Sequence, residues 1–308
     1  MKTRVAVLLG GISSEREVSL VTGRACAKAL EGEGYEVTLI DVAPNLWDQL
    51  HAADPDVVFN ALHGDWGEDG RVQGVLDLFG APYTHSGVMA SALAMDKHRS
   101  KAVLRDIGIN VPDGFLVARK DAAKAHAMEP PYVLKPNGQG SSVSVFIVKA
   151  GQDDLPDIAD NTAMGGQIIC ERFTAGRELT VTVMDGKALS VTEIVPRNAF
   201  YDFDAKYADG GSIHVLPAKI PDEIRDLCLT WAALAHDALG CRGVTRSDFI
   251  FSDINDDLMD NVKKVVMLEV NTQPGMTPTS LVPEQAALAG MNFGQLCRWI
   301  VEDASWPR

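Results

Sequence analysis

Gly243-Val-Thr-Arg-Ser-Asp-Phe-Ile-Phe251 is followed, after a polar link, by Val265-Val-Met-Leu-Glu-Val-Asn-Thr-Gln-Pro-Gly-Met276. Both stretches contain short runs of β-branched and aromatic residues, which are typical of strands. We therefore predict two strands joined by the link from Ser252 to Lys264. Counted from Asp253, this link fails as a calcium-binding EF-hand loop, because its sixth residue is leucine and its twelfth is lysine.

Four polar side chains are spaced two residues apart in these predicted strands. Side chains two apart in a strand point the same way, so Arg246 and Asp248 share one face of the first strand. Glu269 and Asn271 share one face of the second. If the strands pair, the two carboxylates and the carboxamide form a set of hard ligands for magnesium, beside a guanidinium that stabilises an anion. The alternative is ordinary polar positions on a half-solvated sheet, but the tight turn at Gly275, whose N–H groups can face a ligand, favours a site.

The composition of the chain excludes several classes of function. Its 308 residues suit two or three domains of about 100 residues each. The net charge of -14 argues against nucleic acid or a membrane as partner, so an anionic substrate needs local basic groups. The five cysteines lack Cys-x-x-Cys spacing, so we expect reduced buried thiols, no zinc site and a cytoplasmic protein. The apolar run Val5–Leu9 is too short for a signal peptide or a membrane span.

The first part of the chain is typical of an α/β domain with a parallel sheet. Three apolar runs predict its strands: Arg4–Leu9, Tyr35–Ile40 and Asp56–Ala61. Ile12 replaces a glycine of the dinucleotide-binding fingerprint, which disfavours a nicotinamide-dependent dehydrogenase. Glu15 and His63 follow strand ends, where open α/β sheets bind ligands, although a lone histidine there is more often a turn residue satisfied by backbone.

The middle of the chain carries candidate phosphate-binding groups. We predict one helix from Val88 to Asp106 that bears Lys97, and a strand, Tyr132–Lys135, that ends in a lysine. The glycine- and serine-rich turn after this strand is either a surface turn or a flap whose N–H and hydroxyl groups close over phosphates. P-loop and protein-kinase motifs are absent.

Two strands with carboxylates and a long irregular segment follow. Strands at Gln167–Phe173 and Glu178–Val183 bear Glu171 and Glu178, which are acceptors suited to a base and to ribose hydroxyls. Residues 193–218 are predicted to be irregular, and their aromatic content favours an active-site lid.

Five motifs in register closely resemble the D-alanine–D-alanine ligase family. They are Leu-Leu-Gly-Gly-x-Ser-x-Glu-Arg-Glu-Val-Ser (8–19), Ala-Leu-His-Gly (61–64), Gly-Glu-Asp-Gly (67–70), Ser-Gly-Val-Met-Ala-Ser-Ala-Leu-x-Met-Asp-Lys (86–97) and Leu-Glu-Val-Asn-Thr-Gln-Pro-Gly-Met (268–276). The resemblance implies an α/β (α+β) ATP-grasp fold. Its domains would be an N-terminal parallel-sheet domain (1–90), a small central domain (91–175) and a C-terminal mixed-sheet domain (176–308) with a lid at about 193–218.

The resemblance also implies an activity. The family joins two D-alanine molecules with ATP through a D-alanyl phosphate, for peptidoglycan precursor synthesis. The implied cofactors are ATP and two magnesium ions, with manganese as a substitute. The implied partners are the small-molecule substrates and a second copy of the chain in a homodimer, without nucleic acid or membrane.

Site residues are carried over from the resemblance one by one. The nucleotide contacts are Lys97, Lys135, Glu171, Phe173, Glu178 and Lys206, with Phe173 standing where a tryptophan is common. The magnesium ligands are Asp248, Glu269 and Asn271. The catalytic residues are Glu15, Ser141, Arg246 and Gly275, and the D-alanine-binding residues are His63, Tyr207, Ser280 and Leu281.

Two alternatives stay open at this point. A D-alanine–D-lactate ligase differs chiefly in the lid, where Tyr207 favours the dipeptide-forming enzyme. A nucleotide-binding sensor that has lost catalysis is disfavoured, because the chain keeps all three metal-ligand residues and Arg246.

Overall fold

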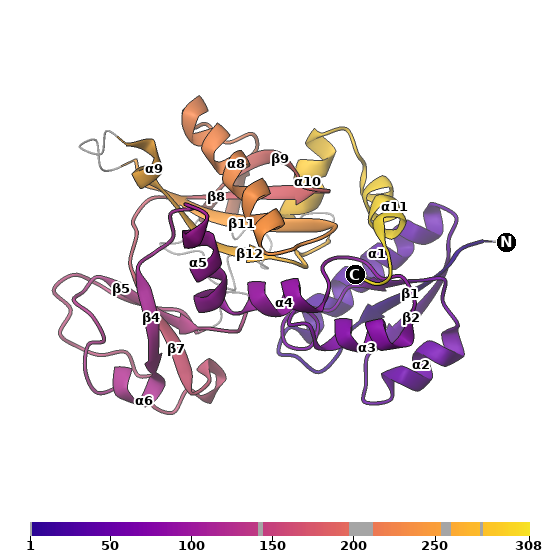
Figure 1. Cartoon of the computed structure of the whole chain (residues 1–308), viewed down its shortest axis with the longest axis horizontal. Helices are drawn as coiled ribbons and strands as arrows, with labels where there is room; N and C mark the ends of the chain where they lie inside the picture. The colour runs from indigo at the N-terminus through magenta and orange to yellow at the C-terminus, as the bar shows by residue number, and fades with distance from the viewer. Residues whose placement is uncertain (1, 141–143, 197–211, 254–259, 278–279) are drawn as a thin grey trace.

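The computed structural model describes residues 2–140, 144–196, 212–253, 260–277 and 280–308. Its strands form three sheets, each of which lies within one of the predicted domain ranges (Figure 1). The ranges themselves stay a prediction. No helix in the described part of the chain is long and apolar enough to cross a membrane.

The N-terminal sheet is parallel, as predicted, with the order β2-β1-β3. Strand β1 is central because nearly all of its residues are apolar and buried on both faces. The elements here are β1 (Arg4–Leu9), α1 (Arg16–Gly32), β2 (Glu36–Asp41), α2 (Leu46–Ala53), β3 (Val57–Asn60) and α3 (Arg71–Phe79). The loops after β1 and β3 carry Glu15 and His63.

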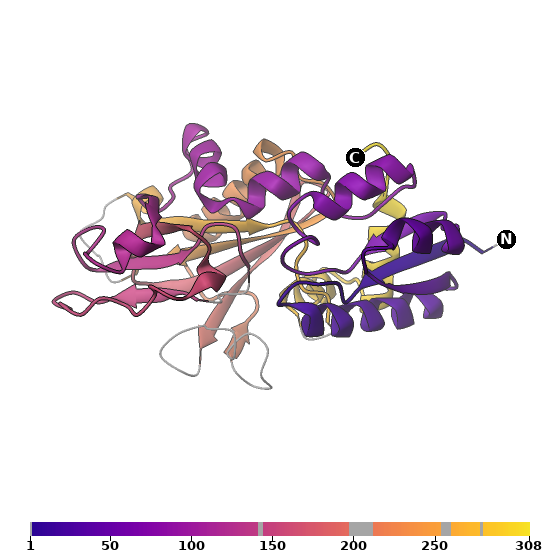
Figure 2. The same ribbon diagram turned by 90° about the horizontal axis from the view of Figure 1, so that it is seen from below.

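Asp96 divides the predicted helix at 88–106 into two, so the single-helix prediction was wrong. Helix α4 covers Val88–Met95 and α5 covers Lys97–Asp106. Asp96 has an extended backbone, and its carboxylate accepts the N–H of Arg99, which caps α5. Figure 2 shows the two helices running from the N-terminal sheet to the other two sheets.

The central sheet is antiparallel with the order β4-β7-β5-β6. The strand before the glycine-rich turn pairs with the strand after it, with Tyr132 opposite Val148. Its elements are β4 (Gly114–Ala118), α6 (Arg119–Ala122), β5 (Tyr132–Pro136), β6 (Phe146–Val148), the short 3-10 helix η1 (Thr162–Met164) and β7 (Gln167–Arg172).

The C-terminal sheet has the order β10-β9-β8-β11-β12, and all four pairings are antiparallel where a mixed sheet was expected. Its strands are β8 (Arg177–Met184), β9 (Lys187–Pro196), β10 (Ser212–Val215), β11 (Val244–Phe251) and β12 (Val265–Asn271). Its helices are α8 (Asp222–Ala238), α9 (Asn261–Lys264), α10 (Leu281–Leu288) and α11 (Phe293–Asp303). Residues 193–196 lie in β9, and residues 212–215 lie in β10. The prediction that these parts of segment 193–218 are irregular was therefore wrong.

The predicted pairing of the two decisive strands is confirmed. Arg246 lies opposite Asn271, and Asp248 lies opposite Glu269. A β-bulge follows Asp248, which is a common feature of strands beside active sites. The four polar groups of the sequence prediction therefore belong to two directly paired rungs of one sheet.

The hydrophobic cores cross the sequence boundaries between sheets. One core joins Val5, Val7 and Leu30 of the N-terminal part to Leu296 and Ile300 of α11, and Figure 1 shows α11 beside α1. All five cysteines are buried as free thiols. Since α11 packs on the N-terminal sheet, the last part of the chain fixes the first part relative to the C-terminal sheet.

His85 is buried at this junction in a left-handed conformation with φ 66°. Its carbonyl accepts a hydrogen bond from Arg308, and its ring packs edge-on against Phe59. Within the described residues its Nδ1 has no hydrogen-bond partner. Burial, together with the neighbouring Arg308 and His63, lowers the pKa of His85 to about 3.

We predict that this histidine makes the junction sensitive to acid. Its folded pKa lies below its unfolded value, so the unfolded chain binds more protons between about pH 6.5 and 3 and stability falls as the pH drops through that range, by up to about 5 kcal/mol. His85→Asn tolerates the positive φ and cannot titrate. Denaturant unfolding of both proteins at several pH values should show a shallower loss for the variant. Parallel pH curves would contradict the prediction.

Candidate active site

A cavity of about 460 Å³ lies between the central and C-terminal sheets. This volume is in the range of ligand pockets in proteins. The cavity brings together five of the six predicted nucleotide contacts: Lys97, Lys135, Glu171, Phe173 and Glu178. The sixth, Lys206, lies outside the described residues, as do the predicted site residues Ser141 and Tyr207.

A smaller cavity of about 60 Å³ is lined by Glu15, His63, Arg246, Asn271 and Gly275. Lys97, Gly140 and Glu269 line both cavities. The two cavities therefore have a shared wall, which carries an ammonium group and a carboxylate. A molecule bound in the small cavity would therefore lie next to one bound in the large cavity.

Lysine side chains hold two carboxylates at the large cavity. Lys97 Nζ lies 3.3 Å from Glu269 Oε2 and donates to the carbonyl of Gln139 at 2.7 Å. Lys135 Nζ lies 2.8 Å from one oxygen of Glu171, and Lys101 Nζ contacts the other oxygen. Both oxygens of Glu171 are thus bound by lysines, a contact that differs from the direct base or ribose contact expected for this residue.

The magnesium-ligand prediction rests on Asp248, Glu269 and Asn271. Arg246 binds both oxygens of Asp248, at 2.9 and 2.7 Å. Thr180 also donates to Asp248 at 2.7 Å, and Asn271 Oδ1 accepts the N–H of Gln273. Within the described part of the chain, no three His, Cys, Asp or Glu side chains form a metal-binding cluster. Two carboxylates and a carboxamide oxygen nevertheless fit magnesium, which binds few protein groups and takes its other ligands from phosphate and water.

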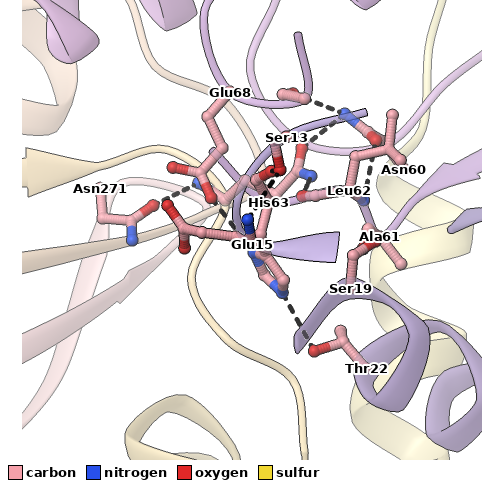
Figure 3. A network of polar contacts seen from close by, with 12 residues as sticks. Ser13, Glu15, Ser19, Thr22, Asn60, Ala61, Leu62, His63, Glu68 and Asn271 are labelled. Carbon is pink, nitrogen blue, oxygen red and sulfur yellow. Dashed lines mark hydrogen bonds and ion pairs between the residues drawn. The ribbon is translucent and has the colours of Figure 1, made fainter. Parts of the chain in front are cut away.

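His63 is held on both ring nitrogens in the small cavity (Figure 3). Its Nδ1 lies 3.1 Å from Glu68 Oε1, and its Nε2 lies 3.0 Å from the hydroxyl of Thr22. The interpretation of His63 as a backbone-bonded turn residue is therefore wrong, since its ring is bound by side chains. Glu68 was not recognised from the sequence, although its spacing of five residues from His63 in a glycine-rich loop places the two close together.

Glycines allow Glu15 to approach its neighbours. A Cβ at Gly64 would lie 2.8 Å from Glu15 Oε1, and one at Gly140 would lie 3.1 Å from the same oxygen. Glu15 is buried at the start of α1, where the helix dipole favours a carboxylate. The carboxylate therefore lies between the loop after β3 and the glycine-rich turn that follows β5.

Ser280 and Leu281 lie at the start of α10, next to Gly275. Ser280 is the N-cap residue, and its hydroxyl accepts the N–H of Thr277 at 3.0 Å. A Cβ at Gly275 would lie 3.3 Å from that hydroxyl, so the turn and the helix start are in close contact. Gln285, one turn along α10, fastens the helix to β8 by accepting the N–H of Thr182 and donating to the carbonyl of Thr180.

Lys101 is a further residue that sequence reasoning missed. It lies four residues after Lys97, hence on the same face of α5, and it is almost completely buried. The spacing was visible in the sequence, but its partner Glu171 lies 70 positions further along the chain.

The central and C-terminal sheets enclose a nucleotide-sized cavity with lysines along it and paired carboxylates at its end. This arrangement defines an enzyme of the ATP-grasp class. Residues 103–302 match the family described as D-ala D-ala ligase C-terminus, and residues 44–86 match the one described as D-ala D-ala ligase N-terminus. The chain belongs to the D-alanine–D-alanine ligase family.

Individual relatives agree with this assignment. A D-alanine–D-alanine ligase of Caulobacter vibrioides is 57% identical over 97% of this chain and 92% of its own length. One of a Ruegeria species is 55% identical over 99% and 97%. The crystal structure of D-alanine–D-alanine ligase from Bacillus anthracis complexed with ATP is 30% identical, with a TM-score of 0.82 over 98% of this chain and 97% of that one.

We predict that Gly64→Ala displaces the carboxylate of Glu15. The new methyl group would occupy the position 2.8 Å from Glu15 Oε1, and the φ of 69° strains any residue with a Cβ. Misplacing this carboxylate, which lines the small cavity, should lower kcat/KM for D-alanine by about 100-fold. The matched control is Gly74→Ala in α3, where a Cβ meets nothing within 4 Å. Equal kinetics for the two variants would contradict this role of Gly64.

Proposed function

We propose that this enzyme, an ATP-dependent ligase that joins two D-alanine molecules for peptidoglycan precursor synthesis, binds ATP in the large cavity and D-alanine in the small one. The observation that supports this arrangement is the wall shared by the two cavities. Lys97 and Glu269 line both, so the γ-phosphate and the carboxylate of the first D-alanine meet at these residues. The adenine would lie beside Phe173, and the ribose beside Glu178.

The first D-alanine is held by opposite charges in this proposal. Glu15 binds its ammonium group, and His63, oriented by Glu68 and Thr22, lies near its carboxylate. A carboxylate oxygen attacks the γ-phosphorus, ADP leaves, and an acyl phosphate forms. The amine of the second D-alanine, whose carboxylate is held at Ser280 and Leu281, then attacks the carbonyl carbon and phosphate leaves.

Charge stabilisation accounts for most of the catalysis in such a reaction. Arg246 and the N–H of Gly275 would stabilise the oxyanion that develops on the carbonyl. Asp248, Glu269 and Asn271 would hold two magnesium ions, which when bound neutralise the charge of the transferring phosphoryl group. Thr180 and Arg246 orient the carboxylate of Asp248 for this task. Ser141, Lys206 and Tyr207 are proposed to complete the site when it closes.

The assembly and the compartment are part of the proposal. We infer a homodimer in the cytoplasm, since the family resemblance implies both and the free thiols are typical of a reducing compartment. Size-exclusion chromatography with light scattering measures the assembly directly.

We predict that ADP release requires D-alanine. A panel of D-alanine, L-alanine, D-serine and D-lactate, assayed with ATP and magnesium, should give strong release with D-alanine and D-alanyl-D-alanine as the product. A depsipeptide formed in preference to the dipeptide when D-lactate is added would identify the D-alanine–D-lactate enzyme. ATP binding without any release of ADP would mean that the chain is a sensor.

We expect Glu269→Gln to lower kcat by about 100-fold or more at saturating magnesium while the protein stays folded. Loss of this carboxylate weakens both metal binding and the neutralisation of phosphoryl charge. The control is Glu36→Gln, an exposed carboxylate on β2. Turnover of Glu269→Gln equal to that of the control would remove Glu269 from the metal site.

A further inference from the structure

Helix α5 carries two buried lysines with different surroundings. Lys97 lines both cavities, whereas Lys101 is not among the described residues that line either one. The Lys101 side chain is only 4% exposed. Burying an ammonium group is costly unless a partner of opposite charge is held beside it. This position therefore requires an anion, and the fold provides Glu171.

Glu171 is shared between two lysines from different elements. Lys101 Nζ on α5 contacts Oε1, and Lys135 Nζ on β5 lies 2.8 Å from Oε2. In the register of the central sheet, Val133 lies opposite Glu171. Lys135 is two residues further along β5, so it is the diagonal neighbour of Glu171 on the same face. The position of this carboxylate is thus fixed from the helix side by Lys101 and from the sheet side by Lys135.

Two of the three groups, Lys101 and Lys135, are basic, and only Glu171 is acidic. Burial and the neighbouring Lys135 lower the pKa of Lys101 to about 7, although Glu171 and Glu269 oppose this change. Burial also works against the charge of Lys135, but Glu171 and Glu269 outweigh it and raise the pKa of Lys135. Lys135, which lines the nucleotide cavity, therefore stays charged at neutral pH.

We propose that Lys101 is a positioning residue of the nucleotide site, which holds Glu171 so that the carboxylate fixes the ammonium group of Lys135 in the cavity. Without Lys101, one oxygen of Glu171 is left buried without its partner. The carboxylate then rotates toward another donor and draws Lys135 with it. The inference rests on the proposed ATP site, and it assigns Lys101 a role that acts through two other residues.

The competing explanation is a purely structural ion pair between α5 and β7. In that case the loss of Lys101 lowers stability and affects all substrates alike. A positioning role predicts a selective loss of nucleotide affinity that depends on Lys135. A double-mutant cycle separates these two explanations.

The experiment measures ADP binding to the full-length protein by calorimetry, without turnover. Lys101→Met should raise the dissociation constant of ADP about tenfold, the effect of losing a charge-assisted contact. In a Lys135→Met background the same substitution should raise it less than about twofold. Lys120→Met, which removes an exposed lysine on α6, is the control and should change nothing.

Kinetics and a second variant complete the test. Lys101→Met should raise the KM for ATP but leave the KM for D-alanine within about twofold. If Lys101→Met does not fold, Lys101→Gln, which keeps a donor to Glu171, replaces it in the cycle. This variant should raise the dissociation constant of ADP by a smaller factor, and the rise should again disappear in the Lys135→Met background. An unchanged ADP affinity, or an equal loss in both backgrounds, overturns the positioning role. Failure of the wild-type protein to bind ADP overturns the nucleotide site itself.

Discussion

The pairing of β11 with β12 is the constraint on which the rest of the site depends. Arg246 lies opposite Asn271 and Asp248 opposite Glu269, so two successive polar rungs face the same side of the C-terminal sheet. If one strand slipped by one residue against the other, its two polar side chains would point to the other face of the sheet. Val270, which lies between Glu269 and Asn271, is buried in the core, and this burial fixes the register. The same hydrophobic interactions that stabilise the sheet therefore place the charged groups.

An acidic chain can bind an anionic nucleotide if its cations are concentrated in one place. The net charge is -14, yet Lys97 on α5 and Lys135 on β5 line the large cavity. A third lysine, Lys101 on α5, contacts Glu171, which also lines this cavity. Each is paired with Glu171 or Glu269, so the lysines are not left as isolated buried charges. Because α5 contacts carboxylates of both sheets, it holds the two walls of the cavity together. The capping of α5 by Asp96 sets where this helix begins.

Much of the site could be predicted from the sequence because its signals are local. The period of two along β11 and β12 identified the metal-ligand candidates, and the strand that ends at Lys135 identified a cavity residue. The sequence could not reveal that Glu171 binds two lysines, since Lys101 looks like any helical lysine until β7 is placed beside it. The helix break at Asp96 was missed because the apolar spacing runs through it, and the strands at the ends of segment 193–218 were missed because their pairing is determined by distant neighbours.

We propose that the carboxylate of D-alanine attacks ATP where the two cavities meet. D-Alanine labelled with a heavy oxygen isotope in its carboxylate provides the test. If an acyl phosphate forms, the phosphate released with each dipeptide carries one labelled oxygen from the carboxylate, which mass spectrometry detects. Unlabelled phosphate, released together with D-alanyl-D-alanine, would rule out an acyl phosphate intermediate.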